Sequence, residues 1–506
     1  MSRPGFVLEV DERTPPLLML AGADLRLERL GLGTQVAYPA DPVASVDPVG
    51  LIDAALESPV GAESLPSLLG PATRLTIVVR DHHRPEPRMR FDVRRSIVER
   101  VLEHAARAGV DDVQIVIATG LNRRWSAPEI SAILGDRVAT SFIPDGLIGS
   151  HDVSSADLVE VGQVGGLPVK LNKRVAESDV VVSVGVVHDH SQGCDFALGL
   201  TDVETINRLD GLGRDEATSR EIVDLVGSAV PAFAVTAVLG QPLLGTSLSF
   251  LNKREWEWRL PEQLAFAGAR QLGSLLPKQS AQRLFGTPVA DYAIGDMIGG
   301  DPTAVREQAR QAWTAANSVA LPGQADVLAM SVWGGSFDRG NPVGSPLNAA
   351  RNALVTQAGS HLGTPLVRDG GVVVARHPLA RNFSNRTQSA AADLFATVLP
   401  ETLDPEEIAQ RFEEGAMHDP WYLNLYREHY ADHPLKVFHT WYRIREATAG
   451  LGDVIWVGAD RHSAALMGHR AATTFADALE IASNTVGSHP SVTHLHGPGR
   501  LLGVIT

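Results

Sequence analysis

Three runs of apolar, largely β-branched residues, each followed at once by a polar loop, constrain the fold of this chain more than any other feature. The runs are 75–79, 113–118 and 179–187. Apolar residues at helical spacing over 93–107, and again after Pro128, separate them. Buried strands that alternate with helices are typical of a parallel sheet covered on both faces. The sequence therefore predicts an α/β fold.

The second half of the chain repeats this pattern. A helix is expected from Asp301-Pro302 to about Ser318, and strands are expected at 326–332, 371–375, 453–457 and 492–496. A chain of 506 residues is also too long for one compact core. We therefore expect two α/β domains, each with a largely parallel sheet flanked by helices and a cleft between them. The predicted ranges are 1–244 and 301–506, with 245–300 as a connector or insertion.

The overall composition narrows the class of partner. The net charge of −15 argues against nonspecific binding to nucleic acid or to an anionic membrane. No apolar run approaches the roughly 18 residues of a membrane span, and the first 30 residues lack the pattern of a signal peptide. The single cysteine, Cys194, excludes an internal disulfide and fits a reducing compartment. We expect a cytoplasmic protein with a small-molecule partner and leave its oligomeric state open.

Polar loops follow all three strands of the first half, at 80–87, 119–124 and 188–195. Ligands of open α/β sheets bind at the carboxyl ends of the strands, so the three loops are expected to form one site. Arg84 can pair with a carboxylate through two parallel hydrogen bonds, and Asp81 can orient a neighbour or accept a hydroxyl proton. The alternative for both is a structural ion pair that braces a proline-rich turn.

The loop after the third strand also contains a set of metal-binding side chains. His188 and His190 lie two residues apart, and Asp195 or Asp210 offers a carboxylate. One hypothesis is a metal site built from these residues. The alternative is a polar loop around a small buried Cys194. The pair His494 and His496, in contrast, is interpreted as the end of a strand.

The order of these motifs resembles that of the nickel-dependent lactate racemase family and its wider group of 2-hydroxyacid racemases and epimerases. The segments that carry the resemblance are Asp81–Pro87 (family pattern Asp-x-Thr-Arg-Pro-x-Pro), Ala118–Arg123 (Ala-Thr-Gly-x-His-Arg), Leu171–Lys173, His190, Trp333–Asp338 (Gly-Gly-x-Pro-x-Asp) and Asn348–Arg351 (Gln-Ala-x-Lys). The resemblance spans most of the chain and implies the two-domain α/β architecture expected above.

The resemblance also implies a mechanism. In that family a nickel pincer nucleotide takes a hydride from C2 of the substrate and returns it to either face, while two bases handle the hydroxyl proton. A lysine tethers the pincer, and a further histidine ligates nickel. The two bases correspond here to Asn122 and His190, and the nickel-ligating histidine falls near Asp210. A substrate-facing lysine corresponds to Arg351, and an aromatic residue of the family site corresponds to Trp441.

Several of these positions depart from the family pattern. Asn122 is a neutral amide, and the tether position falls in 195–200, which contains no lysine. Asp210 prefers harder ions than nickel. Arg351 keeps the positive charge and adds bidentate geometry for a carboxylate. If hydride chemistry persists, the pincer must be held noncovalently; otherwise His188, His190 and Asp210 would hold another divalent metal, or none is bound. His82 or His83 could replace the base lost at Asn122.

The sequence thus predicts an isomerase that acts on a 2-hydroxy acid or sugar acid. His190 is the expected general base, with Asp81 and Asn122 beside it. Substrate contacts are expected from four residues: Arg84, Arg351, Asn348 and Trp441. Two alternatives remain: a metal-dependent lyase or hydrolase on the same scaffold, and a noncatalytic binder of small acids.

Overall fold

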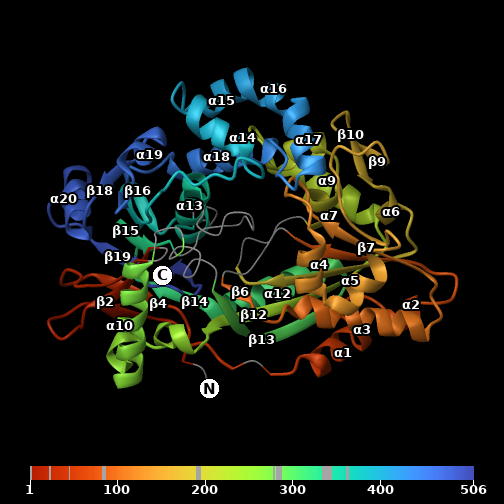
Figure 1. The fold of residues 1–506 in the computed structure, drawn as a ribbon, viewed down its shortest axis with the longest axis horizontal. Helices are drawn as coiled ribbons and strands as arrows, with labels where there is room; N and C mark the ends of the chain where they lie inside the picture. Colours follow the sequence, from red (N-terminus) through yellow and green to blue (C-terminus); the bar gives the residue numbers. More distant parts are fainter. Residues whose placement is uncertain are drawn as a thin grey trace.

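Two seven-stranded sheets form the framework of the protein (Figure 1). The computed structural model describes residues 3–21, 24–44, 46–81, 87–189, 195–276, 280, 288–332, 345–359 and 364–506. The predicted α/β class, with parallel strands flanked by helices, is confirmed. The predicted cleft between two domains stays a prediction.

The first sheet contains the three strands with which the sequence analysis begins. Its strands are, in sheet order, β6 (Arg88–Met89), β13 (Val289–Gly300), β12 (Ala232–Leu244), β11 (Val180–Val187), β5 (Arg74–Arg80), β7 (Asp112–Ala118) and β8 (Ile148–Ser150). The strands from β12 to β8 run parallel, and β13 is antiparallel to β12.

Both faces of this sheet are covered, which is why its strands are continuously apolar. Ile77 and Val79 of β5 belong to one core, together with residues of α1 (Val49–Glu57), α3 (Val93–Arg107) and α4 (Ala127–Leu134). Val78 points to the opposite core, built with α7 (Asp195–Leu200) and α9 (Glu216–Ala229). The alternation follows from the two-residue period of a strand.

The second sheet repeats the arrangement. Its strands are, in sheet order, β1 (Phe6–Glu9), β4 (Gln35–Tyr38), β19 (Val492–Leu495), β15 (Ala325–Ser331), β16 (Val367–Arg376), β17 (Asp453–Val457) and β18 (Arg470–Ala472). All pairs are parallel except β1 with β4. One face packs on α13 (Pro346–Ala350) and α18 (Leu435–Thr448), and the other packs on α20 (Phe475–Val486).

Strand membership crosses the predicted domain ranges in two places. β1 and β4 lie near the start of the chain, yet they extend the second sheet through the pairing of β4 with β19. β13 lies within the predicted connector, 245–300, and is a strand of the first sheet. The division of the chain into independent folding units stays a prediction.

The remaining elements connect and cover the two sheets. Three two-stranded sheets pair β2 (Leu17–Ala21) with β3 (Asp24–Glu28), β9 (Leu158–Val164) with β10 (Leu167–Asn172), and β14 (Ser318–Leu321) with β20 (Leu502–Ile505). Further helices are α2 (Leu65–Leu68), α5 (Asp136–Phe142), α6 (Lys173–Ala176), α8 (Val203–Asp210), η1 (Thr246–Asn252), η2 (Glu255–Glu257), α10 (Leu260–Leu275), α12 (Pro302–Asn317), η3 (Arg351–Gln357), α14 (Ser389–Asp393), η4 (Leu394–Val398), α15 (Pro405–Ile408), η5 (Ala409–Glu413), α16 (Glu414–Met417), α17 (Pro420–Glu428) and α19 (Arg461–Leu466).

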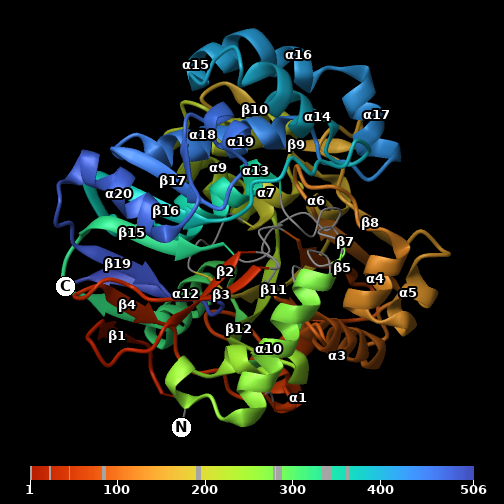
Figure 2. The same cartoon turned by 60° about the vertical axis from the view of Figure 1, so that its left-hand side comes forward.

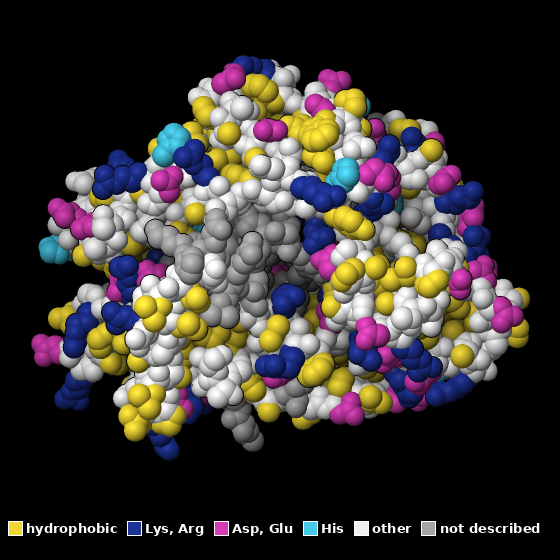
Figure 3. Space-filling view, viewed as in Figure 1, with side chains coloured by type: hydrophobic (Ala, Val, Ile, Leu, Met, Phe, Trp, Pro, Cys, Tyr) yellow, Lys and Arg dark blue, Asp and Glu magenta, His cyan; other side chains and the backbone are white. Residues whose placement is uncertain are grey.

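Helix α10 lies beside the hairpin β2–β3 (Figure 2). Its outer face is apolar, with Leu260, Leu264, Leu272 and Leu275 exposed, and hydrophobic side chains gather over it in the space-filling view (Figure 3). Within the described ranges, no helix combines the length and the apolar character needed to cross a membrane.

Candidate functional site

The loops after β5, β7 and β11 leave the first sheet at the same edge. β5 pairs in parallel with both β7 and β11, so the carboxyl ends of the three strands are neighbours. This is the arrangement that the sequence predicts. The described part of this edge contains Asp81, the loop 119–125, His188 and Asp189.

Two residues predicted from separate motifs meet at this edge. The carboxylate of Asp81, which is 1% exposed, accepts a hydrogen bond from Nδ2 of Asn122 at 3.2 Å. Nε1–H of Trp125 donates to the other oxygen of the same carboxylate. Asp81 therefore fixes the orientation of the Asn122 amide, and Trp125 fixes Asp81.

Gly120 sets the path of the loop that carries Asn122. Its φ is +51°, and a Cβ at this position would lie 2.2 Å from the carbonyl oxygen of Leu198 on α7. Its backbone N–H donates to the carbonyl of Gly199 at 3.0 Å. Only glycine allows this positive φ together with so close an approach to α7.

The next residue, Arg123, braces the loop. Its guanidinium forms two hydrogen bonds with Glu129, of 3.0 and 2.6 Å, and Glu129 is part of the capping box of α4 with Ser126. The backbone N–H of Arg123 donates to Asp432 at 2.9 Å, and Leu121 accepts a bond of 2.9 Å from the N–H of His433. The loop after β7 is therefore held from both halves of the chain.

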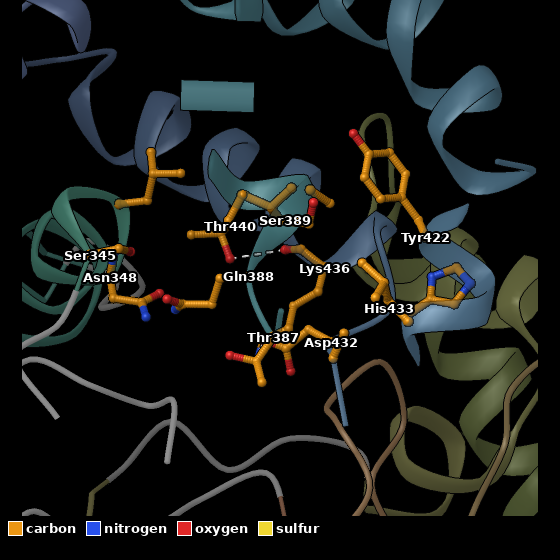
Figure 4. Close-up of a pocket in the computed structure, with 16 residues that line it drawn as sticks. Ser345, Asn348, Thr387, Gln388, Ser389, Tyr422, Asp432, His433, Lys436 and Thr440 are labelled. Atoms are coloured by element: carbon orange, nitrogen blue, oxygen red, sulfur yellow. Dashed lines mark hydrogen bonds and ion pairs between the residues drawn. The ribbon is translucent and has the colours of Figure 1, made fainter. Parts of the chain in front are cut away.

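The segment that holds this loop also forms the wall of a pocket (Figure 4). The pocket is lined mainly by polar side chains of the second half: Ser345, Asn348, Thr387, Gln388, Ser389, Tyr422, Asp432, His433, Lys436 and Thr440. Nζ of Lys436 lies 2.9 Å from the carboxylate of Asp432. Burial lowers the pKa of His433 to about 3, with the charges of neighbouring cationic side chains adding to the effect, so its imidazole is neutral near pH 7.

Asn348, a predicted substrate ligand, lines this pocket. Sequence reasoning missed Asp432, His433 and Lys436, because their link to the loop 121–123 spans about 310 residues of chain and leaves no local pattern.

Sequence reasoning also assigned no specific role to Arg80. The Arg80 side chain is buried and lies against Gly185, where an added Cβ would be 1.8 Å from the Nε of Arg80. The Arg80 guanidinium donates a hydrogen bond of 2.5 Å to the hydroxyl of Thr236 on β12. The only signal was a charged residue at the end of an apolar strand.

Other predicted site residues are placed less directly. Arg351 begins η3 and is half-buried. Trp441 is fully buried in the core of the second half, where its indole N–H donates to the carbonyl of Leu403 at 3.3 Å; this favours a packing role over the predicted substrate contact. Arg84 and His190 lie outside the described residues, as do His82, His83 and Cys194.

The predicted metal ligands are partly engaged elsewhere. Asp210, at the end of α8, pairs with Nε of Arg443 at 3.1 Å and lies 3.5 Å from Nδ1 of His439. Burial alone would raise the pKa of Asp210, but the His439 hydrogen bond and the Arg443 charge outweigh it and lower the pKa below its ordinary range. His188 is buried, with Nε2 3.6 Å from the carboxylate of Asp189.

These observations bear on the pincer nucleotide that the resemblance implies. Helix α7, where the tether lysine is expected, has the sequence DFALGL and contains no lysine. The Asp210 carboxylate is committed to Arg443 and His439. Within the described part of the chain, no three His, Cys, Asp or Glu side chains are arranged to hold a metal ion. The residues present therefore do not fit a tethered nickel pincer.

Comparison with known proteins points to the same family as the sequence motifs do. The family described as the lactate racemase N-terminal domain matches residues 32–194. The chain is 26% identical over 145 residues to a lactate racemase from Thermoanaerobacterium thermosaccharolyticum, and 24% identical over 142 residues to one from Lactiplantibacillus plantarum. Each alignment covers 28% of this chain and spans about a third, 31%, of the relative.

The similarity in fold covers a much larger part of the chain than the similarity in sequence does. The structure of the lactate racemase apoprotein from T. thermosaccharolyticum superposes with a TM-score of 0.63 at 16% identity, covering 97% of this chain and 100% of the other. The fold likeness extends over both sheets, whereas the detectable sequence match lies in the region that holds Asp81 and Asn122. Residues 32–194 are therefore similar to the N-terminal domain of lactate racemases, and the fold of the whole chain is similar to that of a lactate racemase apoprotein.

Proposed function

We propose that this protein is an isomerase, a racemase or epimerase, that acts on a small 2-hydroxy acid or sugar acid. The observation that carries the proposal is the contact of 3.2 Å between Asp81 and Asn122. These residues come from two motifs of the matched region, 32–194, and meet at the edge of the sheet where α/β proteins bind ligands. The lactate racemases to which part of this chain is similar supply the reaction class.

In this proposal each site residue has a defined task. Asp81 holds the amide of Asn122 so that its carbonyl oxygen accepts a hydrogen bond from the substrate hydroxyl. Arg84 and Arg351 pair with the substrate carboxylate. His190 removes the C2 proton, and the electron pair left on C2 is delocalised into the carboxylate, where the two arginines stabilise it. No step passes through a nickel pincer, because the residues present do not fit one.

Single enantiomers test the proposal. D- and L-lactate and D- and L-glycerate are incubated separately in D2O, and the products are analysed by chiral chromatography and by mass spectrometry for deuterium at C2. We expect inversion with deuterium uptake for at least one acid. Asn122→Ala is expected to lower turnover by about 10²-fold, whereas Asp111→Asn, at an exposed residue directly before β7, should leave it unchanged. Absence of both inversion and exchange for every acid would overturn the proposal.

A second candidate is a lyase or hydrolase on the same scaffold. It is favoured by Asn122, an amide where the family carries one of its two bases, since a single base suits proton removal from one face. In that case the same incubations would yield a new product with the remaining substrate still a single enantiomer.

A further inference from the structure

A second pocket opens where the carboxyl ends of strands from both sheets converge. It is lined by Asp189, which follows β11 of the first sheet, by Ser331 and His496 at the ends of β15 and β19 of the second sheet, and by Asn352, Gln357 and Arg500. The pocket is partly open to solvent, and together with the open space at its mouth it has a volume of about 750 Å³. Parallel sheets bind ligands at their carboxyl ends, and here two sheets present those ends to one space.

His496 is held in this pocket by a buried carboxylate. Its Nε2 lies 2.7 Å from Oε1 of Glu255, and both side chains are less than a tenth exposed. Glu255 also accepts hydrogen bonds from the backbone N–H of Leu18 at 2.7 Å and from the hydroxyl of Tyr38 at 3.3 Å. The Tyr38 ring stacks on the imidazole with 4.3 Å between the ring centres. The imidazole is therefore fixed in both position and plane.

The hydrogen bond to Glu255 also selects the tautomer of His496. A carboxylate only accepts hydrogen bonds, so Nε2 carries the proton and Nδ1 is the basic nitrogen of the neutral ring. Burial alone would raise the pKa of Glu255, but the interaction with His496 and the hydrogen bond from the backbone N–H of Leu18 lower it, which keeps the carboxylate ionised. A histidine backed by a carboxylate is the arrangement that acid–base catalysis uses to orient an imidazole and stabilise its charged form.

Arg500 supplies a cation beside this histidine. Its backbone is fixed by Gln241 of β12, which accepts from the Arg500 N–H at 2.8 Å and donates to the Arg500 carbonyl at 2.5 Å. Its guanidinium forms no hydrogen bond or ion pair with any other described residue, and it lines the pocket. Asp189 also lines the pocket, and its carboxylate disfavours a second negative charge on the ligand. These features suit a monoanionic hydroxy acid.

We propose that His496 is an acid–base residue of this protein, with Glu255 as its positioning residue. It acts on the small hydroxy acid of the proposed function, to whose carboxylate Arg500 contributes a further cation in addition to Arg84 and Arg351. The inference rests on the proposed function and supplies what Asn122 cannot, a second base. Nδ1 of His496 accepts the C2 proton from one enantiomer, and the electron pair moves into the carboxylate. His190, the base of the proposed function, then supplies a proton to C2, and the configuration inverts. The other enantiomer uses the same two groups in reverse.

Four variants test this proposal: His496→Gln, Glu255→Gln, Glu255→Asp and Arg500→Gln. Deuterium uptake from D2O is followed separately for each enantiomer of lactate and glycerate. His496→Gln is expected to lower kcat by about 10²–10⁴-fold for at least one enantiomer with KM within a few-fold of the parent. Arg500→Gln should instead raise KM by about tenfold or more. Glu255→Gln should lower kcat, and Glu255→Asp should restore part of it.

Controls separate catalysis from folding. His462→Gln replaces an exposed histidine of the same half and should change nothing, and His496→Asn gives a second test if His496→Gln unfolds at a lower temperature than the parent. If the parent inverts an acid and folded His496→Gln does so at the same rate in both directions, this inference is wrong and the proposed function stands. If the parent neither inverts nor exchanges any acid, the proposed function fails first and the role of His496 fails with it.

Discussion

The carboxylate of Asp432 accepts a hydrogen bond of 2.9 Å from the backbone N–H of Arg123. The next residue, His433, donates its backbone N–H to the carbonyl of Leu121, two residues before Arg123, at 2.9 Å. These two bonds flank Asn122, which itself contacts Asp81. The position of the Asn122 amide is therefore determined jointly by the first sheet and by the segment between α17 and α18.

The substitution Asp432→Ala tests this joint control. It removes the acceptor for the Arg123 N–H and leaves Lys436 without its carboxylate partner, so we expect the free energy of unfolding to fall by about 1–3 kcal/mol. Urea unfolding measures the change. Asp419→Ala, which removes the N-cap of α17 but no bond to the loop, should cost about 1 kcal/mol and leave turnover intact. Equal turnover in the two variants would contradict the role given to Asp432.

The loop after β7 should not tolerate a side chain at Gly120. Gly120→Ala places a Cβ 2.2 Å from the Leu198 carbonyl at a φ of +51°, and we expect a loss of at least about 2 kcal/mol. Gly146→Ala is the matched control, because Gly146 has a φ of +67° with nothing within 4 Å of the added Cβ. It should cost about 1 kcal/mol. The difference between the two thermal unfolding shifts measures the contact with α7; no difference would show that the loop can move away from it.

Metal analysis tests the fit of the nickel pincer. Elemental mass spectrometry of the purified protein is expected to find no stoichiometric nickel, since α7 contains no lysine and Asp210 is paired with Arg443. For the same reason Asp210→Asn should leave the metal content unchanged. Near-stoichiometric nickel in the parent protein, lost in Asp210→Asn, would contradict this assignment and restore the hydride mechanism.

Asp210→Asn should also change stability in a pH-dependent way. The folded-state pKa of Asp210 lies below its ordinary value of 3.8, so the carboxylate contributes stability above that pH and loses it as the pH falls through the folded pKa. The variant should therefore be less stable than the parent at pH 7, with the difference shrinking toward pH 3. A constant difference across urea titrations at these pH values would argue against the ion pair with Arg443.

The buried histidine His494 should make the fold sensitive to acid. Burial, with a smaller effect from the charge of His496, lowers the pKa of His494 from 6.5 to about 3. Since the unfolded chain binds the proton more readily, stability is full above about pH 6.5 and falls as the pH drops toward 3. His494→Leu should flatten this dependence between pH 7 and pH 5 in urea unfolding, and exposed His462→Leu should not. Parallel curves for parent and His494→Leu would contradict the assignment.

The sequence predicts those parts of the fold that are encoded locally. The runs at 75–79, 113–118 and 179–187 form buried parallel strands because β-branched residues pack well on both faces of a covered sheet. The helix at 93–107 is confirmed at both ends. β13 was missed since its residues include three glycines and two aspartates rather than an apolar run. The pairing of β4 with β19 has no local signature.

The candidate site also divides into features that are encoded locally and contacts between distant segments. Asp81 and Asn122 could be placed together from sequence, because each follows a strand and neighbouring parallel strands end side by side. The pairing of Glu255 with His496 could not, since the two residues lie 241 positions apart and the sequence around His496 reads as a strand end. Asp432 was missed for a similar reason. Contacts between distant segments depend on how the two halves pack, which no periodicity records.

The pairing of β4 with β19 has a consequence for how the protein is made. Residues 35–38 emerge from the ribosome long before their partner strand, residues 492–495, which lies more than 450 positions later in the chain. During translation the edge of β4 stays exposed while the first sheet can already assemble. Such a long sequence separation slows closure of the second sheet and leaves an unpaired strand edge open to wrong partners. Any dependence on chaperones during biosynthesis would arise at this pairing of β4 with β19.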